Sequence, residues 1–255
     1  MGIPAVGLTG NIHSDFEKEA DQVISFGLGG EKLDFVTKGV VTLSTFLMLF
    51  ALHTAVRLGR LDEACAEEQK AQMRLAMENY ESIVAGFDVF FQRNRKNLLS
   101  MEKAYLIGAG ANYGTALEGD CKIGERSISL AWEYEEDRGI QAHTIQLHTQ
   151  LQILIFIDPG DETAARIEQS YRAAKVISDR VYILSNNPLI QGDGVMRVPH
   201  QVDEMISPLY TLAFVQMMAY TVSETNSTWK QHPLMKEYKA ILFGKSDTYQ
   251  AYDCT

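Results

Sequence analysis

The sequence predicts an α/β fold in which a doubly wound, mostly parallel sheet is covered by helices on both faces. Short apolar runs are nearly continuous rather than alternating, segments with helical periodicity separate them, and glycine-, asparagine- or proline-containing turns follow several of them. A parallel strand is buried on both faces, and therefore its apolar run is continuous. Strands of this kind alternate with helices in a doubly wound sheet.

The first 58 residues are expected to hold two short strands, a short helix between them and one long apolar helix. The expected strands are 4–9 and 22–26, and the expected helices are 15–20 and 37–58. The segment 40–56 carries no charge, but it falls short of the ~20 apolar residues that a membrane span needs, and Ser, Thr and His interrupt it. We therefore expect a helix that is buried on most sides.

A charged amphipathic helix is expected from Leu61 to about Lys96. Its apolar residues repeat at alternating steps of four and three; they are Met73, Met77, Tyr80, Val84, Phe87 and Phe91. This spacing is typical of a helix packed on a neighbour. We interpret it as a connector between two α/β units.

A second α/β unit is expected to follow the connector. Its expected strands are 104–107, 128–132, 151–157, 181–184 and 195–198, and its expected helices are 115–125, 162–177 and 207–222. Residues 1–58 repeat the element order of 151–222 but lack a strand, glycine turn and helix like those at 104–126. We therefore expect a partial first domain (1–58), a connecting helix (59–100), a complete second domain (101–225) and a tail (226–255).

Composition limits the classes of partner. The chain has 255 residues, of which 46% are hydrophobic and 22% charged, and a formal net charge of −10. This charge disfavours a broad nucleic-acid-binding face but permits a small anionic substrate, because backbone N–H groups can bind anions locally. Three scattered cysteines and the lack of a signal-peptide pattern suggest a cytoplasmic protein with no membrane partner. The sequence has no HExxH, Walker, nucleophile-elbow or EF-hand pattern, and we therefore expect no metal and no cofactor.

The most informative pattern lies at 107–125, where a strand passes through a glycine turn into a helix. This arrangement is the general ligand-binding corner of α/β folds. The glycine spacing differs from G-x-G-x-x-G, which disfavours a dinucleotide site.

Glu118, Lys122 and Glu125 are spaced i, i+4 and i+7, which places them on one face of the expected helix. One interpretation is a solvated ion pair that contributes only ~0.3–0.5 kcal/mol. The other is a carboxylate base beside an ammonium group, which suits proton transfer between neighbouring carbons of a sugar. Spacing alone leaves both open.

The run Gly108-x-Gly110-x-x-Tyr113, followed by Ala-Leu-Glu-Gly-x-x-Lys-x-x-Glu over 116–125, resembles the start of a second SIS (sugar isomerase) domain. It is similar to the isomerase half of glucosamine-6-phosphate synthase and to the fructosamine-6-phosphate deglycases. The resemblance implies a flavodoxin-like SIS fold with one complete and one partial SIS domain. It also implies a homodimer that acts on a sugar phosphate or an amino-acid adduct of one, by isomerase or deglycase chemistry through an enediol or enediolamine.

The resemblance further implies roles for single residues. It matches Glu125 to the catalytic glutamate and Lys122 to a catalytic lysine, and it makes His143 and His232 candidate acid–base groups. The expected substrate-binding residues are Gly108, Gly110, Asn112, Tyr113, Glu118, Thr37 and Lys38. We prefer Glu125 to Glu118 as the base, because a helix beginning at Thr115 would lower the pKa of a carboxyl in its first turn.

Two departures weaken the match. The family binds the sugar phosphate with a Ser-x-Ser-Gly-x-Thr loop in the early part of its first domain, and no such sequence occurs here. The His-Gly-Pro that the family places after a glutamate-rich stretch does not follow 133–139. Without the phosphate-binding loop we expect poor or no turnover of sugar phosphates, because binding energy remote from the reacting carbons is lost. The alternative function is a non-catalytic sugar-phosphate-binding or regulatory module.

Overall fold

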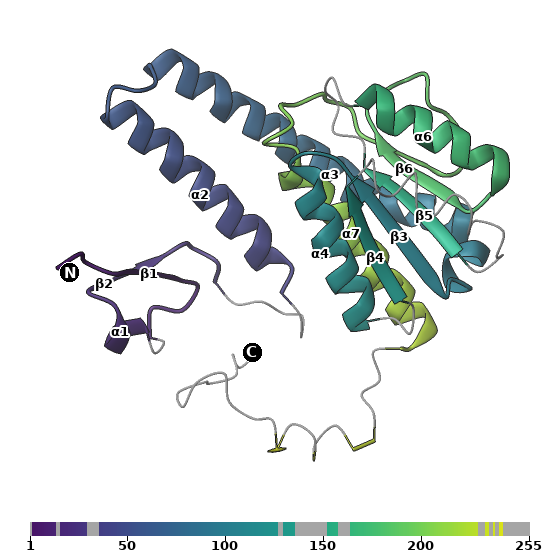
Figure 1. The fold of residues 1–255 in the computed structure, drawn as a ribbon, viewed down its shortest axis with the longest axis horizontal. Coiled ribbons are helices and arrows are strands. Elements are labelled where there is room, and N and C mark those ends of the chain that lie inside the picture. The colour runs from purple at the N-terminus through teal and green to yellow at the C-terminus, as the bar shows by residue number, and fades with distance from the viewer. Residues whose placement is uncertain are drawn as a thin grey trace. The chain divides into compact units, whose positions relative to one another are not determined.

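The computed structural model describes residues 2–13, 16–29, 36–126, 130–135, 152–157 and 164–228, with 233–234, 237 and 240–241. The chain divides into two compact units (Figure 1). Unit 1 consists of residues 1–66 and 231–255, and unit 2 consists of residues 67–230.

Unit 1 contains the expected order of strand, helix, strand and long helix. These elements are β1 (Val6–Thr9), α1 (Phe16–Glu19), β2 (Gln22–Ser25) and α2 (Lys38–Arg57). The two strands pair in parallel, with Val6 opposite Gln22 and Thr9 opposite Ser25. The Ala5 N–H donates a hydrogen bond of 2.7 Å to the Asp21 carboxylate, which holds the starts of the strands together.

The expectation that α2 is buried on most sides is wrong. Gly39 is its one buried residue, and 6% of its most apolar 18-residue window is buried. By length and composition α2 could cross a membrane, a test that core helices of soluble proteins also pass. The apolar composition of α2 indicates that its side chains favour an apolar environment. The residues that the structure describes cover only a small part of these side chains.

Unit 2 is built on five parallel strands in the order β4-β3-β5-β6-β7. The strands are β3 (Lys103–Gly108), β4 (Leu130–Glu135), β5 (Gln152–Ile157), β6 (Val181–Ser185) and β7 (Val195–Arg197). The helices are α3 (Glu63–Leu99, which begins in unit 1), α4 (Asn112–Arg126), α6 (Ala164–Ile177) and α7 (Pro208–Asn226). The predicted parallel pairing of 104–107 with 151–157 is confirmed, since Ala104 lies opposite Ile153 and Ile107 opposite Phe156.

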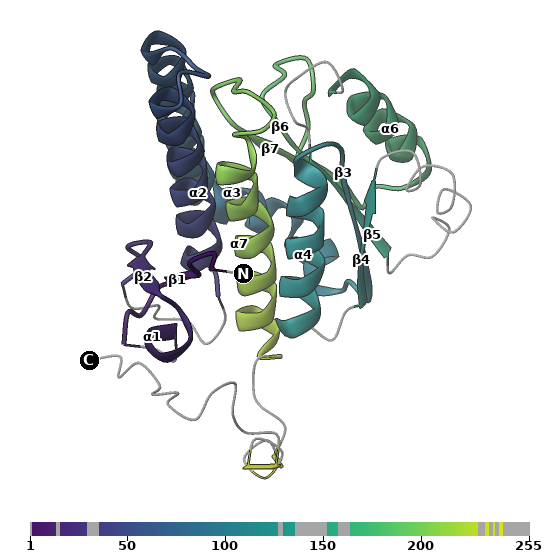
Figure 2. The same cartoon turned by 60° about the vertical axis from the view of Figure 1, so that its left-hand side comes forward.

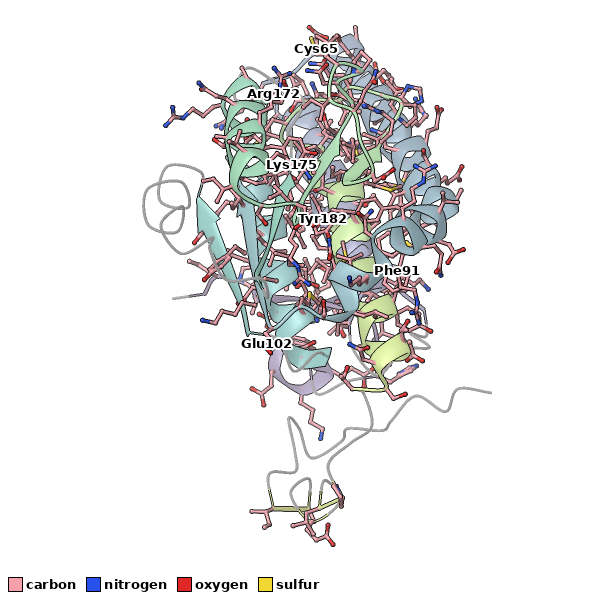
Figure 3. The ribbon with its side chains drawn as sticks, turned by 90° about the vertical axis from the view of Figure 1, so that its right-hand side faces the viewer. Cys65, Phe91, Glu102, Arg172, Lys175 and Tyr182 are labelled. Atoms are coloured by element: carbon pink, nitrogen blue, oxygen red, sulfur yellow. The ribbon has the colours of Figure 1, made fainter. Side chains whose placement is uncertain are left out.

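Helices cover both faces of this sheet, as its continuous apolar strands predicted. Figures 1 and 2 show α4 and α7 side by side on one face and α6 on the other. The α6 face is closed by a buried cluster that includes Tyr105, Phe156, Ile167, Tyr171 and Ile183. The opposite face holds an aromatic cluster formed by Phe87, Phe90, Phe91, Tyr182 and Phe214, two of which, Phe91 and Tyr182, are labelled in Figure 3.

The strand order places a ligand-binding position at the glycine turn. The order reverses between β3 and β5, and in open parallel sheets ligands bind outside the carboxyl ends of the strands at such a point. The turn 109–111 leaves β3 there and leads into α4. Gly119 lets α4 lie close to the sheet, because a Cβ on it would be 2.3 Å from a Leu106 methyl group.

Candidate functional site

The three charged residues predicted to share a face do so on α4. The Lys122 Nζ lies 3.0 Å from the Glu125 Oε2 and 3.8 Å from the Glu118 Oε1. The exposed fraction is 6% for the Lys122 side chain, 18% for Glu118 and 46% for Glu125. The ammonium group is therefore enclosed between two carboxylates, unlike the solvated ion pair that spacing alone allowed.

Burial and charge shift the ionisation of this group. Burial raises the pKa of Glu118 above its usual range, although the positive charge of Lys122 and a hydrogen bond from Gln216 on α7 oppose the shift. Burial alone would lower the pKa of Lys122, but the hydrogen bond to Glu125 and the negative charges of both glutamates outweigh it, and the pKa is raised. The cation is thus retained, while Glu118 binds a proton more readily than an ordinary glutamate.

The reasoning that separated Glu118 from Glu125 starts from a wrong helix boundary. α4 begins at Asn112, not Thr115, so that Glu118 lies in the second turn. The pKa of its carboxyl is raised rather than lowered, because the group is buried. Glu125 lies thirteen residues after Asn112, about 20 Å along the helix axis. The charged face was expected at the carboxyl edge of the sheet. It instead runs along α4 away from that edge.

Asn112 belongs to a buried polar network between the first turns of α4 and α7. Its amide donates to the Ser207 Oγ at 2.7 Å and accepts from the Thr211 Oγ1 at 2.7 Å. The Thr115 Oγ1 lies 3.2 Å from the same amide oxygen and 2.9 Å from the Thr211 Oγ1. Asn112 is 0% exposed, so a ligand could contact its side chain only after these bonds opened. Its substrate-binding role stays a prediction.

The other expected residues are more dispersed. Gly108 ends β3, Gly110 has a φ of +53°, and the Tyr113 side chain is exposed. Thr37 and Lys38 belong to unit 1, at the start of α2. His143 and His232 lie outside the described residues.

Sequence reasoning missed Gln216 and Glu204. Gln216 donates to Glu118 from α7, and a single polar residue within the apolar run 212–219 was the signal that could have identified it. Glu204 accepts a hydrogen bond from the Ala111 N–H at the glycine turn, 93 residues away in sequence, and no local pattern predicts that contact.

A cavity of about 670 Å³ lies next to the glycine turn that precedes α4, because Glu204, which binds the Ala111 N–H, lines it. Glu118, Lys122 and Glu125 do not line this cavity. It is lined by Glu68, Gln69, Gln72, Gln201, Val202, Asp203, Glu204 and Met205. Within the described part of the chain, no three His, Cys, Asp or Glu side chains are grouped in a way that could hold a metal ion.

No family model matches the chain, but curated relatives do. The glutamine–fructose-6-phosphate aminotransferase (isomerizing) of Caldanaerobacter subterraneus subsp. tengcongensis is 22% identical over 223 residues, which cover 86% of this chain and 36% of that protein. The corresponding protein of Clostridium acetobutylicum is 24% identical over 228 residues, with 88% and 37% covered. The chain thus spans little more than a third of the length of these relatives.

Solved structures share the fold. A protein assigned as a phosphosugar isomerase from Clostridium difficile 630 matches with a TM-score of 0.84 and 17% identity, over 96% of this chain and 69% of that one. The C-terminal domain of glucosamine-fructose-6-phosphate aminotransferase from Francisella tularensis matches with a TM-score of 0.70 and 17% identity, over 88% and 64%.

The match to the Clostridium difficile structure also includes part of α2. It leaves out 4% of the chain, about ten of 255 residues, and so it includes at least half of this 20-residue helix. At least half of α2 therefore lies within the matched part of the chain. The chain has the SIS-domain phosphosugar isomerase fold and is related to the isomerase domain of the glutamine–fructose-6-phosphate aminotransferases.

Proposed function

We propose that the chain acts on a sugar phosphate, by aldose–ketose isomerisation or by cleavage of an amino-acid adduct of fructose 6-phosphate. The observation that carries the proposal is the enclosed Lys122 ammonium between the carboxylates of Glu118 and Glu125. The curated relatives, which are named for fructose 6-phosphate, support the choice of substrate class.

In the proposed isomerisation, the Glu125 carboxylate removes a proton from C1 of the ketose. The electron pair of that C–H bond forms the C1–C2 double bond, and the C2 oxygen takes up a proton to give the enediol. Lys122 stabilises the negative charge that develops on this oxygen. Return of a proton to C2, with loss of the proton from the C1 oxygen, gives the aldose. The deglycase alternative begins with removal of a C1 proton from the amino-acid adduct, which gives an enediolamine that carries nitrogen on C1 and a hydroxyl on C2. Return of a proton to C2 gives an imine at C1, and water hydrolyses this imine to the aldose phosphate and the free amino acid.

Several features of the proposed enzyme await direct tests. His143 or His232 would act as the acid–base group, and Glu118 would bind substrate. The remaining proposed substrate-binding residues are Gly108, Gly110, Asn112, Tyr113, Thr37 and Lys38. We propose one complete and one partial SIS domain, poor turnover by this chain, and a homodimer in which the exposed apolar surface of α2 is covered.

A non-catalytic sugar-phosphate-binding or regulatory module is the second candidate. A solved structure of the same fold favours it. A protein assigned as sugar-binding from Salmonella typhimurium LT2 has the same fold, with a TM-score of 0.73 and 20% identity over 87% of this chain and 65% of that one. A structure of an Escherichia coli CFT073 protein in complex with A5P matches with a TM-score of 0.50.

Deuterium exchange at C1 of fructose 6-phosphate separates the two candidates. The chain is incubated with the sugar phosphate in deuterated buffer, exchange is followed by NMR, and binding is measured by calorimetry. If the unmodified chain catalyses exchange and Glu125→Gln does not, the enzyme is supported. We expect the exchange rate of the unmodified chain to be far below the ~10 s⁻¹ of a typical enzyme. Binding without exchange supports the module, and neither binding nor exchange refutes both.

A further inference from the structure

The start of α4 already has an acceptor for each of its first N–H groups. A helix begins with four N–H groups that lack partners within the helix, and these groups are what binds a phosphate at a helix start. The N–H groups of Asn112, Tyr113 and Gly114 donate to the carbonyls of Ala109, Gly110 and Ala111, at 3.0, 3.2 and 3.2 Å. The remaining group, the Ala111 N–H, donates to the Glu204 carboxylate at 2.8 Å.

The Glu204 carboxylate lies directly against the glycine turn. A Cβ on Gly110 would be 1.4 Å from the Glu204 Oε1, so any side chain there would displace the carboxylate. Gly110 also has a φ of +53°, a conformation that glycine adopts without strain. Both features allow an oxygen to approach the backbone closely, which is how glycine turns of α/β folds accept an anionic ligand.

A second link fixes Glu204 at this turn. Its carbonyl accepts hydrogen bonds from the Ser207 Oγ at 2.7 Å and the Ser207 N–H at 3.2 Å. The Ser207 Oγ in turn accepts from the buried Asn112 amide in the first turn of α4. Backbone and side chain of Glu204 therefore both connect to the start of α4, and the carboxylate is held in place rather than resting on the surface.

We propose that Glu204 is an internal anion that occupies the ligand-binding position at the start of α4 and excludes the phosphate of a ligand from it. Negative charge is favourable at a helix start, and the carboxylate provides it without an external ligand. A phosphorylated ligand of unit 2 would then have its phosphate bound away from the glycine turn. This exclusion of phosphate does not require the proposed sugar-phosphate chemistry, and inorganic phosphate alone tests it.

The experiment is a titration of the ¹⁵N-labelled full chain with inorganic phosphate, in which the Ala111 amide signal and the thermal midpoint are followed. In the unmodified chain neither should change up to millimolar phosphate. In Glu204→Ala the vacated position should bind phosphate, giving a saturating shift of the Ala111 signal and a phosphate-dependent rise of the midpoint. Glu204→Gln should stay unresponsive, because its side-chain oxygen still accepts the Ala111 N–H.

Glu68→Gln is the matched control for charge. Glu68 lines the same cavity as Glu204, so this change removes one negative charge there while the Ala111 bond remains. A phosphate response in Glu68→Gln equal to that of Glu204→Ala would show that charge, not occupancy, excludes phosphate, and would overturn the proposal. A folded but unresponsive Glu204→Ala would overturn it too. If Glu204→Ala does not fold, the unmodified chain decides: a saturating phosphate shift of its Ala111 signal refutes the proposal, and a constant signal supports it.

Discussion

Replacing Lys122 by Met tests the electrostatic description of the α4 face. Met nearly preserves the volume and the apolar stem but removes the cation that lies 3.0 Å from Glu125 and 3.8 Å from Glu118. Breaking a fully buried ion pair costs about 3–5 kcal/mol, whereas an exposed pair contributes about 0–1 kcal/mol. Glu118 is mostly enclosed and Glu125 is half exposed, so we expect Lys122→Met to lower the free energy of unfolding by about 1–3 kcal/mol at neutral pH.

The same change should depend on pH with a definite sign. The pKa of Glu118 is raised in the folded chain, so the folded state binds more protons than the unfolded state as pH rises above the ordinary glutamate range. Stability therefore falls with rising pH until the raised pKa is passed. Without the positive charge of Lys122 the pKa rises further, so the cost of Lys122→Met should be small where Glu118 is protonated and should grow towards neutral pH.

Urea denaturation at several pH values measures this cost. The matched control is Lys70→Met, which breaks an exposed pair with Glu67 at 2.7 Å and should cost no more than about 1 kcal/mol at neutral pH. A cost of Lys122→Met that is independent of pH, or no larger than that of Lys70→Met, would refute the electrostatic reasoning.

Further changes probe α4 and its contacts with α7. Glu125→Gln should abolish exchange of the substrate C1 proton while phosphate-dependent binding persists; exchange lost in Glu118→Gln but kept in Glu125→Gln would reverse the two roles. Gly119→Ala should destabilise the chain by about 1–3 kcal/mol, because its Cβ would meet Leu106 at 2.3 Å. Gly124→Ala, whose Cβ meets nothing within 4 Å, should instead stabilise it by about 0.5–1 kcal/mol, and equal effects in thermal melts would contradict the packing argument. Ser207→Ala should cost about 1–3 kcal/mol by removing the acceptor of a buried amide, and an unchanged denaturation midpoint would argue against that network.

The fold was largely predictable because its signals are local. The strands β3, β5 and β6 contain nearly continuous apolar runs, and such runs are typical of a sheet whose two faces are both covered. The sequence places the start of α4 at Thr115, three residues too late. The carbonyls of residues 109–111 accept the first N–H groups of the helix, and no sequence pattern marks this added turn.

The candidate site was less predictable because part of it is formed by distant residues. Spacing along one helix was enough to group Glu118, Lys122 and Glu125. The burial of Glu118 and Lys122 depends on α7, which is distant in sequence. The hydrogen bond at the glycine turn depends on Glu204, which lies in the loop before α7. The exposure of α2 also could not be predicted, since composition does not reveal whether a covering partner is present.

The position of β3 in the sheet has a consequence for folding. β3 is the first strand of unit 2 in sequence, yet it lies inside the sheet between β4 and β5. Lys103 pairs with Leu130 and with Gln152, which are 27 and 49 residues further along the chain. No tight hairpin can form this sheet, so during synthesis β3 stays unpaired until these later strands have emerged. Its apolar side chains and its unpaired backbone N–H and C=O groups therefore stay exposed for longer than those of any strand added afterwards. We expect slow, topology-limited folding for this unit.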